Sequence, residues 1–150
     1  MEEENNFWSK ILNENLCKVK SPKRILEEQA DNFNKISRSI LCTIISSFEE
    51  PVHDWNSMNT PFEEEGQLER EYVVRMKLQV PSLDNYTILI LTVKYQISQI
   101  YPCTIKNYLT NDSWETLENQ NQFESKLKKI LNSTEMLKLL GNLYSQQNDL

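Results

Sequence analysis

Glycine is scarce in this chain, with two residues in 150. Loops that cradle phosphates, and turns that bring the backbone close to a nucleotide, need glycine because it adopts positive φ without a steric penalty. Neither Gly66 nor Gly141 stands in such a motif. We therefore expect no nucleotide cofactor, and the sequence carries no motif for any other cofactor.

Positive charge is also in short supply. The chain has 16 Lys and Arg residues against 22 Asp and Glu residues, a net charge of −6 and a pI near 4.9. Proteins that bind nucleic acids neutralise phosphates with clustered Lys and Arg. The composition therefore predicts that the partner of this chain is not a nucleic acid.

Targeting and membrane-spanning segments are missing as well. The first four residues, Met-Glu-Glu-Glu, lack the basic-then-apolar pattern of a signal peptide. No apolar run approaches the ~20 residues that cross a bilayer. Three cysteines, an odd number at wide spacing, do not suggest a disulfide framework. We expect a cytoplasmic protein that has no membrane partner.

The chain has one histidine, His53, so a catalytic dyad or triad built on histidine would have to use it. It lies among acidic residues, and no serine or cysteine near it stands on an elbow-like turn. Together with Cys17, Cys42 and Cys103 it could in principle bind a metal, but the spacing contains no C-x-x-C or H-x-x-x-H element. We expect neither a catalytic site nor a metal site from these residues.

Asp84 and Lys94 are further candidates for a metal-dependent catalytic site. An aspartate that precedes a strand ending in Thr92-Val93-Lys94 resembles the magnesium-binding core of some nucleases. In that core an acidic residue occupies the position of Thr92, and a hydroxyl alone is a poor ligand for a hard cation. We therefore expect a protein that is not an enzyme, with a degenerate nuclease-like or ligand-binding domain as the alternative.

The stretch from Leu68 to Ile105 carries the strongest structural pattern and predicts three consecutive strands. Alternation over 68–80 gives one apolar and one polar face, and Pro81 with the polar residues after it forms a turn. The run from Tyr86 to Ile97 is apolar on both faces, as in a central strand. In the third strand Pro102 predicts a sheet edge or the start of the strand. The inward residues of the third strand are expected to be Tyr101, Cys103 and Ile105.

Matching apolar faces predicts the register of the first two of these strands. A slip by one residue would turn Lys94 toward the core, at a high desolvation cost. The polar face then also holds three apolar residues, Val73, Ile88 and Ile90, which suggests a homodimer contact as an alternative function. The predicted core positions are Leu89, Leu91, Val93, Tyr95 and Ile97, opposite Leu78, Met76, Val74 and Tyr72.

Helices flank this region. Ser21 followed by Pro22 predicts a helix start, and that helix should run to about Asn34. Lysines and an arginine between Lys18 and Arg24 oppose the dipole at this helix start, which hints at contact with an anion or an acidic partner. The remaining expected elements are an amphipathic helix over 5–16, a strand over Ser37–Phe48, a polar connector over Tyr108–Gln120, and two C-terminal helices capped at Asn121 (with Glu124) and Asn132 (with Glu135).

These elements predict one α+β domain spanning residues 1–150. Consecutive strands with short turns favour a four-stranded antiparallel meander, and segregated helices favour a two-layer sandwich with the N- and C-terminal helices packed on one face. The predicted order is α-α-β-β-β-β-α-α.

The segment from Glu49 to Gln67 is a long loop in which aromatic and apolar residues stand among carboxylates. Tryptophan anchors interfaces, and acidic fields steer association with basic partners. We therefore predict a non-enzymatic protein that binds another protein with a basic surface through this loop and the open sheet face. In size, charge and absence of catalytic motifs it resembles the general class of small inhibitors, immunity proteins and adaptors. The predicted partner-binding residues are Trp55, Met58, Phe62, Glu63, Glu64, Glu65, Glu69 and Glu71.

Overall fold

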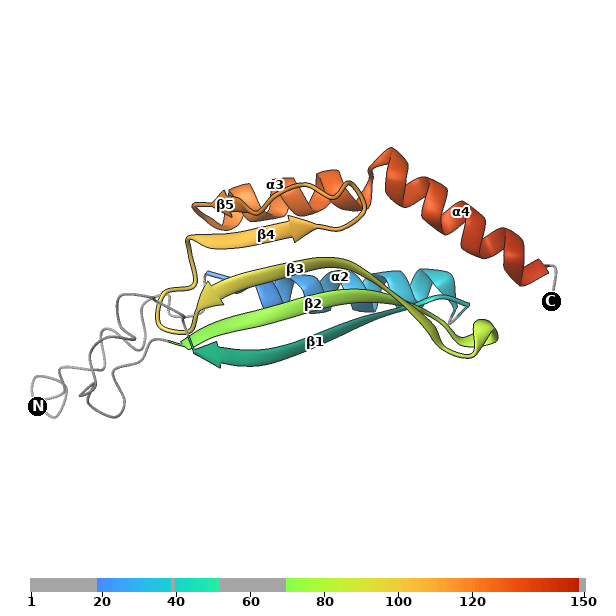
Figure 1. The fold of residues 1–150 in the computed structure, drawn as a ribbon, viewed down its shortest axis with the longest axis horizontal. Coiled ribbons are helices and arrows are strands. Elements are labelled where there is room, and N and C mark those ends of the chain that lie inside the picture. The colour runs from blue at the N-terminus through green and yellow to red at the C-terminus, as the bar shows by residue number, and fades with distance from the viewer. Residues whose placement is uncertain (1–18, 39, 52–69, 149–150) are drawn as a thin grey trace, which may run out of the picture.

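The computed structural model describes residues 19–38, 40–51 and 70–148, and the helix expected over 5–16 lies outside these ranges. The described chain is α+β, as predicted, and contains five strands and three α-helices (Figure 1). Its elements, in order, are α2 (Pro22–Ser37), β1 (Cys42–Pro51), β2 (Arg70–Val80), a 3-10 turn (Pro81–Leu83), β3 (Tyr86–Gln96), β4 (Cys103–Asn107), β5 (Glu115–Leu117), α3 (Gln120–Leu131) and α4 (Thr134–Asn148).

The strands form one antiparallel meander in the order β1-β2-β3-β4-β5. The prediction of four strands is wrong because β5 lies inside the segment expected to be a polar connector. With three residues, β5 is too short for alternation to reveal it. β4 begins directly after Pro102 and lies between β3 and β5, so Pro102 marks the start of a strand and not a sheet edge.

The strand expected from Ser37 begins later, at Cys42, because α2 continues to Ser37. Arg38, the residue after the helix, forms its C-cap in a left-handed conformation with φ 52°. The Asn34 side chain then pairs with the backbone of Thr43. Its amide donates to the Thr43 carbonyl over 3.2 Å, and its Oδ1 accepts from the Thr43 N–H over 2.7 Å. These bonds join the last turn of α2 to β1.

The register between β2 and β3 is as predicted around the strand centres, where Met76 faces Leu91 and Val74 faces Val93. A β-bulge between Met76 and Lys77 then shifts it by one residue. Leu78 consequently faces Ile88 instead of Leu89. A one-residue shift exchanges the two faces of a strand. Side chains predicted for the core and for the polar face therefore change places beyond the bulge.

The predicted homodimer strip of Val73, Ile88 and Ile90 is affected most. Ile90 is fully buried in the core, and Ile88 packs against the same core. Val73 stays on the other face, where it is 1% exposed between its cross-strand neighbours on β1 and β3. The expectation that these three residues share an exposed strip is wrong, because the bulge turns two of them inward.

The core lies between one face of the sheet and the helices. Figure 1 shows α2 behind β2 and β3. Buried residues of α2, α3 and α4, such as Leu26, Phe123 and Met136, belong to the same cluster as Val74 and Leu91 of the sheet. Among the helices that the structure describes, none combines the length and apolar character needed to cross a membrane.

The caps predicted for the C-terminal helices are wrong in position. α3 is capped by Asn119, whose Oδ1 accepts from the Gln122 N–H over 2.9 Å. Asn132, expected to start α4, instead ends α3. The Ser133 hydroxyl accepts from the Met136 N–H over 3.2 Å at the start of α4. Several Asn and Ser residues stand near each boundary, so composition alone does not select the capping residue.

Candidate functional site

Most of the predicted partner-binding residues lie outside the described ranges: Trp55, Met58, Phe62, Glu63, Glu64, Glu65 and Glu69. His53 and Cys17 lie outside them too. Glu71 is the one predicted site residue that the structure places. It lies on β2, directly opposite Glu50 of β1.

The sheet face turned away from the core is the most distinctive described surface, and we call it the outer face. The strand register places its side chains in rows across the sheet. One row runs through Ser46, Arg75, Thr92 and Lys106, and the next through Phe48, Val73, Lys94, Thr104 and Thr116. Cationic and aromatic side chains from different strands are therefore neighbours on this face.

Three cations of the outer face lie over aromatic rings. The Arg75 guanidinium carbon is 4.8 Å from the ring centre of Phe48. The Lys94 ammonium is 4.9 Å from the ring centre of Trp114. Such contacts contribute about 0.5–1 kcal/mol at exposed sites and also fix the position of the charge.

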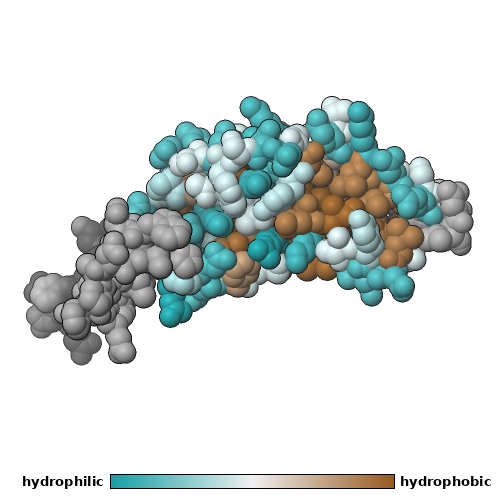
Figure 2. All heavy atoms as spheres, in the orientation of Figure 1, coloured by the Kyte–Doolittle hydropathy of each residue, from teal (hydrophilic) through white to brown (hydrophobic). Residues whose placement is uncertain are grey.

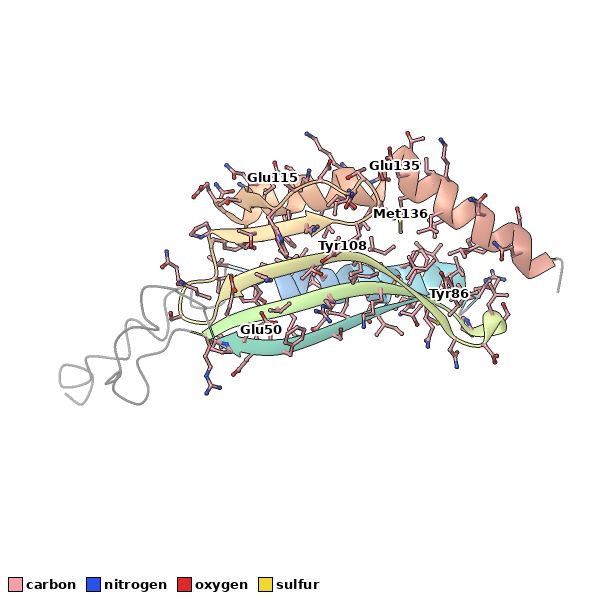
Figure 3. The ribbon with its side chains drawn as sticks, in the orientation of Figure 1. Glu50, Tyr86, Tyr108, Glu115, Glu135 and Met136 are labelled. Carbon is pink, nitrogen blue, oxygen red and sulfur yellow. The ribbon has the colours of Figure 1, made fainter. Side chains whose placement is uncertain are left out.

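The third pair joins Lys106 and Tyr108, with the ammonium 5.4 Å from the ring centre. The Tyr108 hydroxyl also lies 3.3 Å from Thr92 Oγ1, which donates to it, and the Tyr108 N–H donates to the Ile90 carbonyl over 2.9 Å. Figure 3 shows Tyr108 between β3 and β4. Trp114 and Tyr108 remain 40% and 37% exposed, so both rings are available for contact.

The outer-face cations have no carboxylate partner within ranges 19–38, 40–51 and 70–148. The ion pairs found there lie elsewhere, for example Arg70 with Glu49 at 3.2 Å and Lys126 with Glu115 at 2.9 Å. The Nε atom of Arg75 is buried and has no hydrogen-bond partner. A buried polar group without a partner costs free energy. That buried atom is shielded from a partner, so the capacity of the outer face to bind acceptor groups comes from Lys94 and Lys106, which have no carboxylate partner among the described residues.

Charge is unevenly distributed along the outer face. Glu50 and Glu71 face each other near the end of β1 and the start of β2, where like charges repel. The cations Arg75, Lys94 and Lys106 lie farther along the strands. The outer face is thus acidic at the end that adjoins segment 52–69 and basic in the middle.

A second polar cluster lies on the opposite face, at the start of α2. The Lys23 ammonium donates to the Tyr72 hydroxyl over 3.0 Å, and Ser47 Oγ is 2.9 Å from the same oxygen. The ring of Tyr95 packs edge-on against Tyr72, with centres 5.5 Å apart. The hydrogen bond from Lys23 lowers the pKa of Tyr72 and raises the pKa of Lys23.

Of the basic residues between Lys18 and Arg24, in which the sequence suggested an anion contact, Lys18 lies outside the described residues and the other three have carboxylate partners. Lys20 and Arg24 pair with Glu28 at 3.1 and 3.5 Å, and Lys23 approaches Glu27 at 3.8 Å. The unfavourable positive charge at the helix start is therefore offset by glutamates one or two turns later.

Within the described residues, the other groups with candidate chemistry are not brought together. Asp84 lies in the turn before β3, whereas Lys94 lies toward the far end of that strand. Cys42 and Cys103 belong to strands separated by β2 and β3, and burial raises the pKa of Cys103 to about 12. No group of three metal-ligating side chains is present in the part of the chain that the structure describes.

The chain matches no family model, no curated protein and no solved structure. The geometry of the described surfaces is therefore the basis for functional argument. Sequence reasoning missed the aromatic members of the outer face: Phe48, Tyr108 and Trp114. One signal for a basic face was present in the sequence, because Arg75 and Lys77 lie two residues apart on β2 and therefore share the outer face.

Proposed function

We propose that this protein is a non-enzymatic binding module that receives an acidic segment of another protein on its outer sheet face. The observation that supports this is the set of three cations, each held over an aromatic ring and each without a carboxylate partner among the described residues. Arg, Trp and Tyr dominate the binding energy of protein interfaces. An acidic segment would supply the acceptors that Lys94 and Lys106 lack.

A protein partner fits this surface better than a nucleic acid. The whole chain carries a net charge of −6, and Glu50 and Glu71 stand on the same face. Both repel the continuous charge of a phosphate backbone. A protein segment can place a few carboxylates over the basic middle of the face and keep its own cations near the acidic end.

The acidic loop remains part of the proposal. The predicted partner-binding residues from Trp55 to Glu69 lie outside the described ranges, and segment 52–69 joins the sheet at the acidic end of the outer face. We propose that a basic part of the same partner contacts the loop. The charge of the partner would then mirror that of the face, which is how complementary interfaces set their register.

Charge reversal on the outer face tests the proposal. The double variant Lys94→Glu with Lys106→Glu should bind a fluorescein-labelled, Glu-rich peptide at least about tenfold more weakly than the natural protein. The matched control is Lys129→Glu with Lys138→Glu, which changes the net charge equally at exposed positions on α3 and α4. Fluorescence anisotropy at low and at physiological salt measures both variants beside the natural protein.

Two results would overturn the proposal. An equal loss of affinity in the control would assign the effect to overall charge and not to the outer face. Preferential binding of single-stranded oligo(dT) over the Glu-rich peptide would replace the protein partner with a nucleic acid. Thermal melts of both variants show whether a loss of affinity reflects a loss of fold.

A further inference from the structure

An apolar cavity of about 530 Å³ lies between the sheet, α2 and the two C-terminal helices. Figure 2 shows a hydrophobic surface patch in the region between β3 and α4, and Figure 3 shows Met136 pointing from α4 toward the strands. The apolar side chains that line the cavity include Phe33, Ile90, Leu127, Leu131, Met136 and Leu140.

The strand beside this cavity is β3. On one of its edges β3 pairs with β4, but only along part of its length. β4 pairs with β3 from Leu91 to Lys94, and one further bond joins the Tyr108 N–H to the Ile90 carbonyl over 2.9 Å. From Tyr86 to Leu89, no strand among the described residues pairs with β3 on that edge. At about 3.3 Å per residue this edge is about 13 Å long.

The bulge lies next to the unpaired edge of β3 and turns a side chain of β3 into the cavity. Because of the extra residue in β3, Ile90 turns into the cavity and Ile88 packs against the core. The opposite wall is formed by Met136 and Leu140, which lie four residues apart on one side of α4. α4 adds apolar side chains to the cavity but no backbone partner for β3.

We infer that this edge and cavity bind an extended apolar segment of another polypeptide by strand addition. An unpaired strand edge is satisfied by another backbone, which supplies both donors and acceptors. Side chains on an added strand alternate between its two faces, so every second one would enter the cavity. An aliphatic lipid chain could fill the cavity but would leave the edge of β3 unpaired. The site is separate from the outer-face cations and does not depend on the proposed function.

Peptides with alternating apolar residues test this inference. The probes are an array of short peptides in which Thr alternates with Val, Ile, Leu or Phe, each beside a copy whose alternate amides are N-methylated. Removing two backbone donors should weaken binding about tenfold, since each hydrogen bond contributes about 0.5–1.5 kcal/mol. Hydrogen exchange should slow when an unmethylated peptide binds at those amides between Tyr86 and Leu89 that point away from β2, which are every second one.

A matched pair of α4 variants locates the site. Leu140→Gln places a polar group in the cavity wall and should weaken the best peptide several-fold. Leu137→Gln makes the same change at a position that is 63% exposed and does not line the cavity, and should leave affinity unchanged. The outer-face variant Lys94→Glu with Lys106→Glu should also bind the peptide normally, which separates this site from the proposed function.

Three results would overturn the inference. The first is an array in which no peptide binds. The second is equal affinity for the methylated and unmethylated copies, which would show an apolar pocket that does not pair with a strand. The third is an equal loss of affinity in the two α4 variants while both keep the melting temperature of the natural protein.

Discussion

Among the described residues, Tyr72 has an ionisation that a specific neighbour, Lys23, changes. Lys23 donates a hydrogen bond to its oxygen, and this bond lowers the pKa of Tyr72 below its usual value of 10.0 and raises that of Lys23 above 10.5. Both shifts express one attraction, between an ammonium and a developing phenolate. Tyr95, in ring contact with Tyr72, has its pKa raised instead, because burial disfavours its charged form.

The signs of these shifts predict how stability depends on pH. The contribution of Lys23 is present below pH 10.5 and is lost as pH rises through its raised pKa. The contribution of Tyr72 ionisation is present above pH 10.0 and is lost as pH falls through its lowered pKa. Replacing Lys23 should therefore be more destabilising near pH 10 than at neutral pH.

The Lys23→Met variant provides the measurement. Its Tyr72 pKa should rise toward the ordinary value, as followed by NMR of the tyrosine ring carbons. Urea unfolding at neutral pH and near pH 10 should show the larger loss of stability at the higher pH. Lys35→Met, at an exposed position on the same helix, is the control and should leave Tyr72 unchanged. A Tyr72 that titrates identically in all three proteins would contradict the hydrogen bond from Lys23.

At the scale of elements, the β-bulge in β3 decides which aliphatic residues form the core. Ile90 is fully buried, whereas Leu89 pairs across from Lys77 on the outer face and is half-buried. Ile90→Ala should therefore destabilise the protein by about 2–4 kcal/mol, through lost burial and a cavity. Leu89→Ala should destabilise it by about 1 kcal/mol or less. Urea unfolding of both variants measures the difference.

The register without a bulge makes the opposite prediction for this pair. In that register Leu89 faces the core and Ile90 faces the polar side, so Leu89→Ala would be the more damaging change. Equal or reversed losses in the two variants would therefore contradict the observed pairing. The slopes of the unfolding curves should be the same in both, since neither change alters the surface exposed on unfolding.

The bulge also shows why sequence predicted this fold only in part. Alternation over 68–80 correctly identified β2, and the partners of Val74 and Met76 followed from it. The run of Ile88, Leu89, Ile90 and Leu91 is aliphatic at every position. Shifting such a run by one residue costs no hydrophobic burial, so face matching could not place the bulge. The candidate site could not be predicted for a related reason. Trp114 precedes β5, and with three residues β5 is too short to show the alternation that would place Trp114 on the outer face.

For the whole molecule, net charge was a poor guide to local surfaces. The net charge of −6 is a sum over the whole chain and does not show where acidic and basic residues gather. Carboxylates gather near segment 52–69, while Arg75, Lys94 and Lys106 meet only after β2, β3 and β4 have paired. Because charges interact over about 8–10 Å at physiological salt, the local arrangement decides what the outer face attracts.

Stability should also vary across the molecule, with α4 as the least protected of the described α-helices. Among the residues of α4 whose burial is described, Met136 and Leu143 are buried, whereas α2 buries residues at both ends and in the middle. Local opening of α4 exposes less apolar surface, so its amides should open with a free energy lower by about 2 kcal/mol or more. Hydrogen exchange under native conditions tests this by comparing peptides from α2, α3 and α4.

The side chain of Met136 supplies the contrast that makes the exchange experiment specific. Met136→Ala removes a buried anchor of α4 and should speed exchange in α4, while amides in α2 and the strands keep their protection. Leu137→Ala, at an exposed position on the same helix, should change exchange little, since alanine favours helix and no core contact is lost. If all helices instead exchanged together in every variant, α4 would belong to one cooperative unit with the sheet. Helix α4 would then leave the cavity only by global unfolding. A peptide would have to bind the edge of β3 while α4 stays in place.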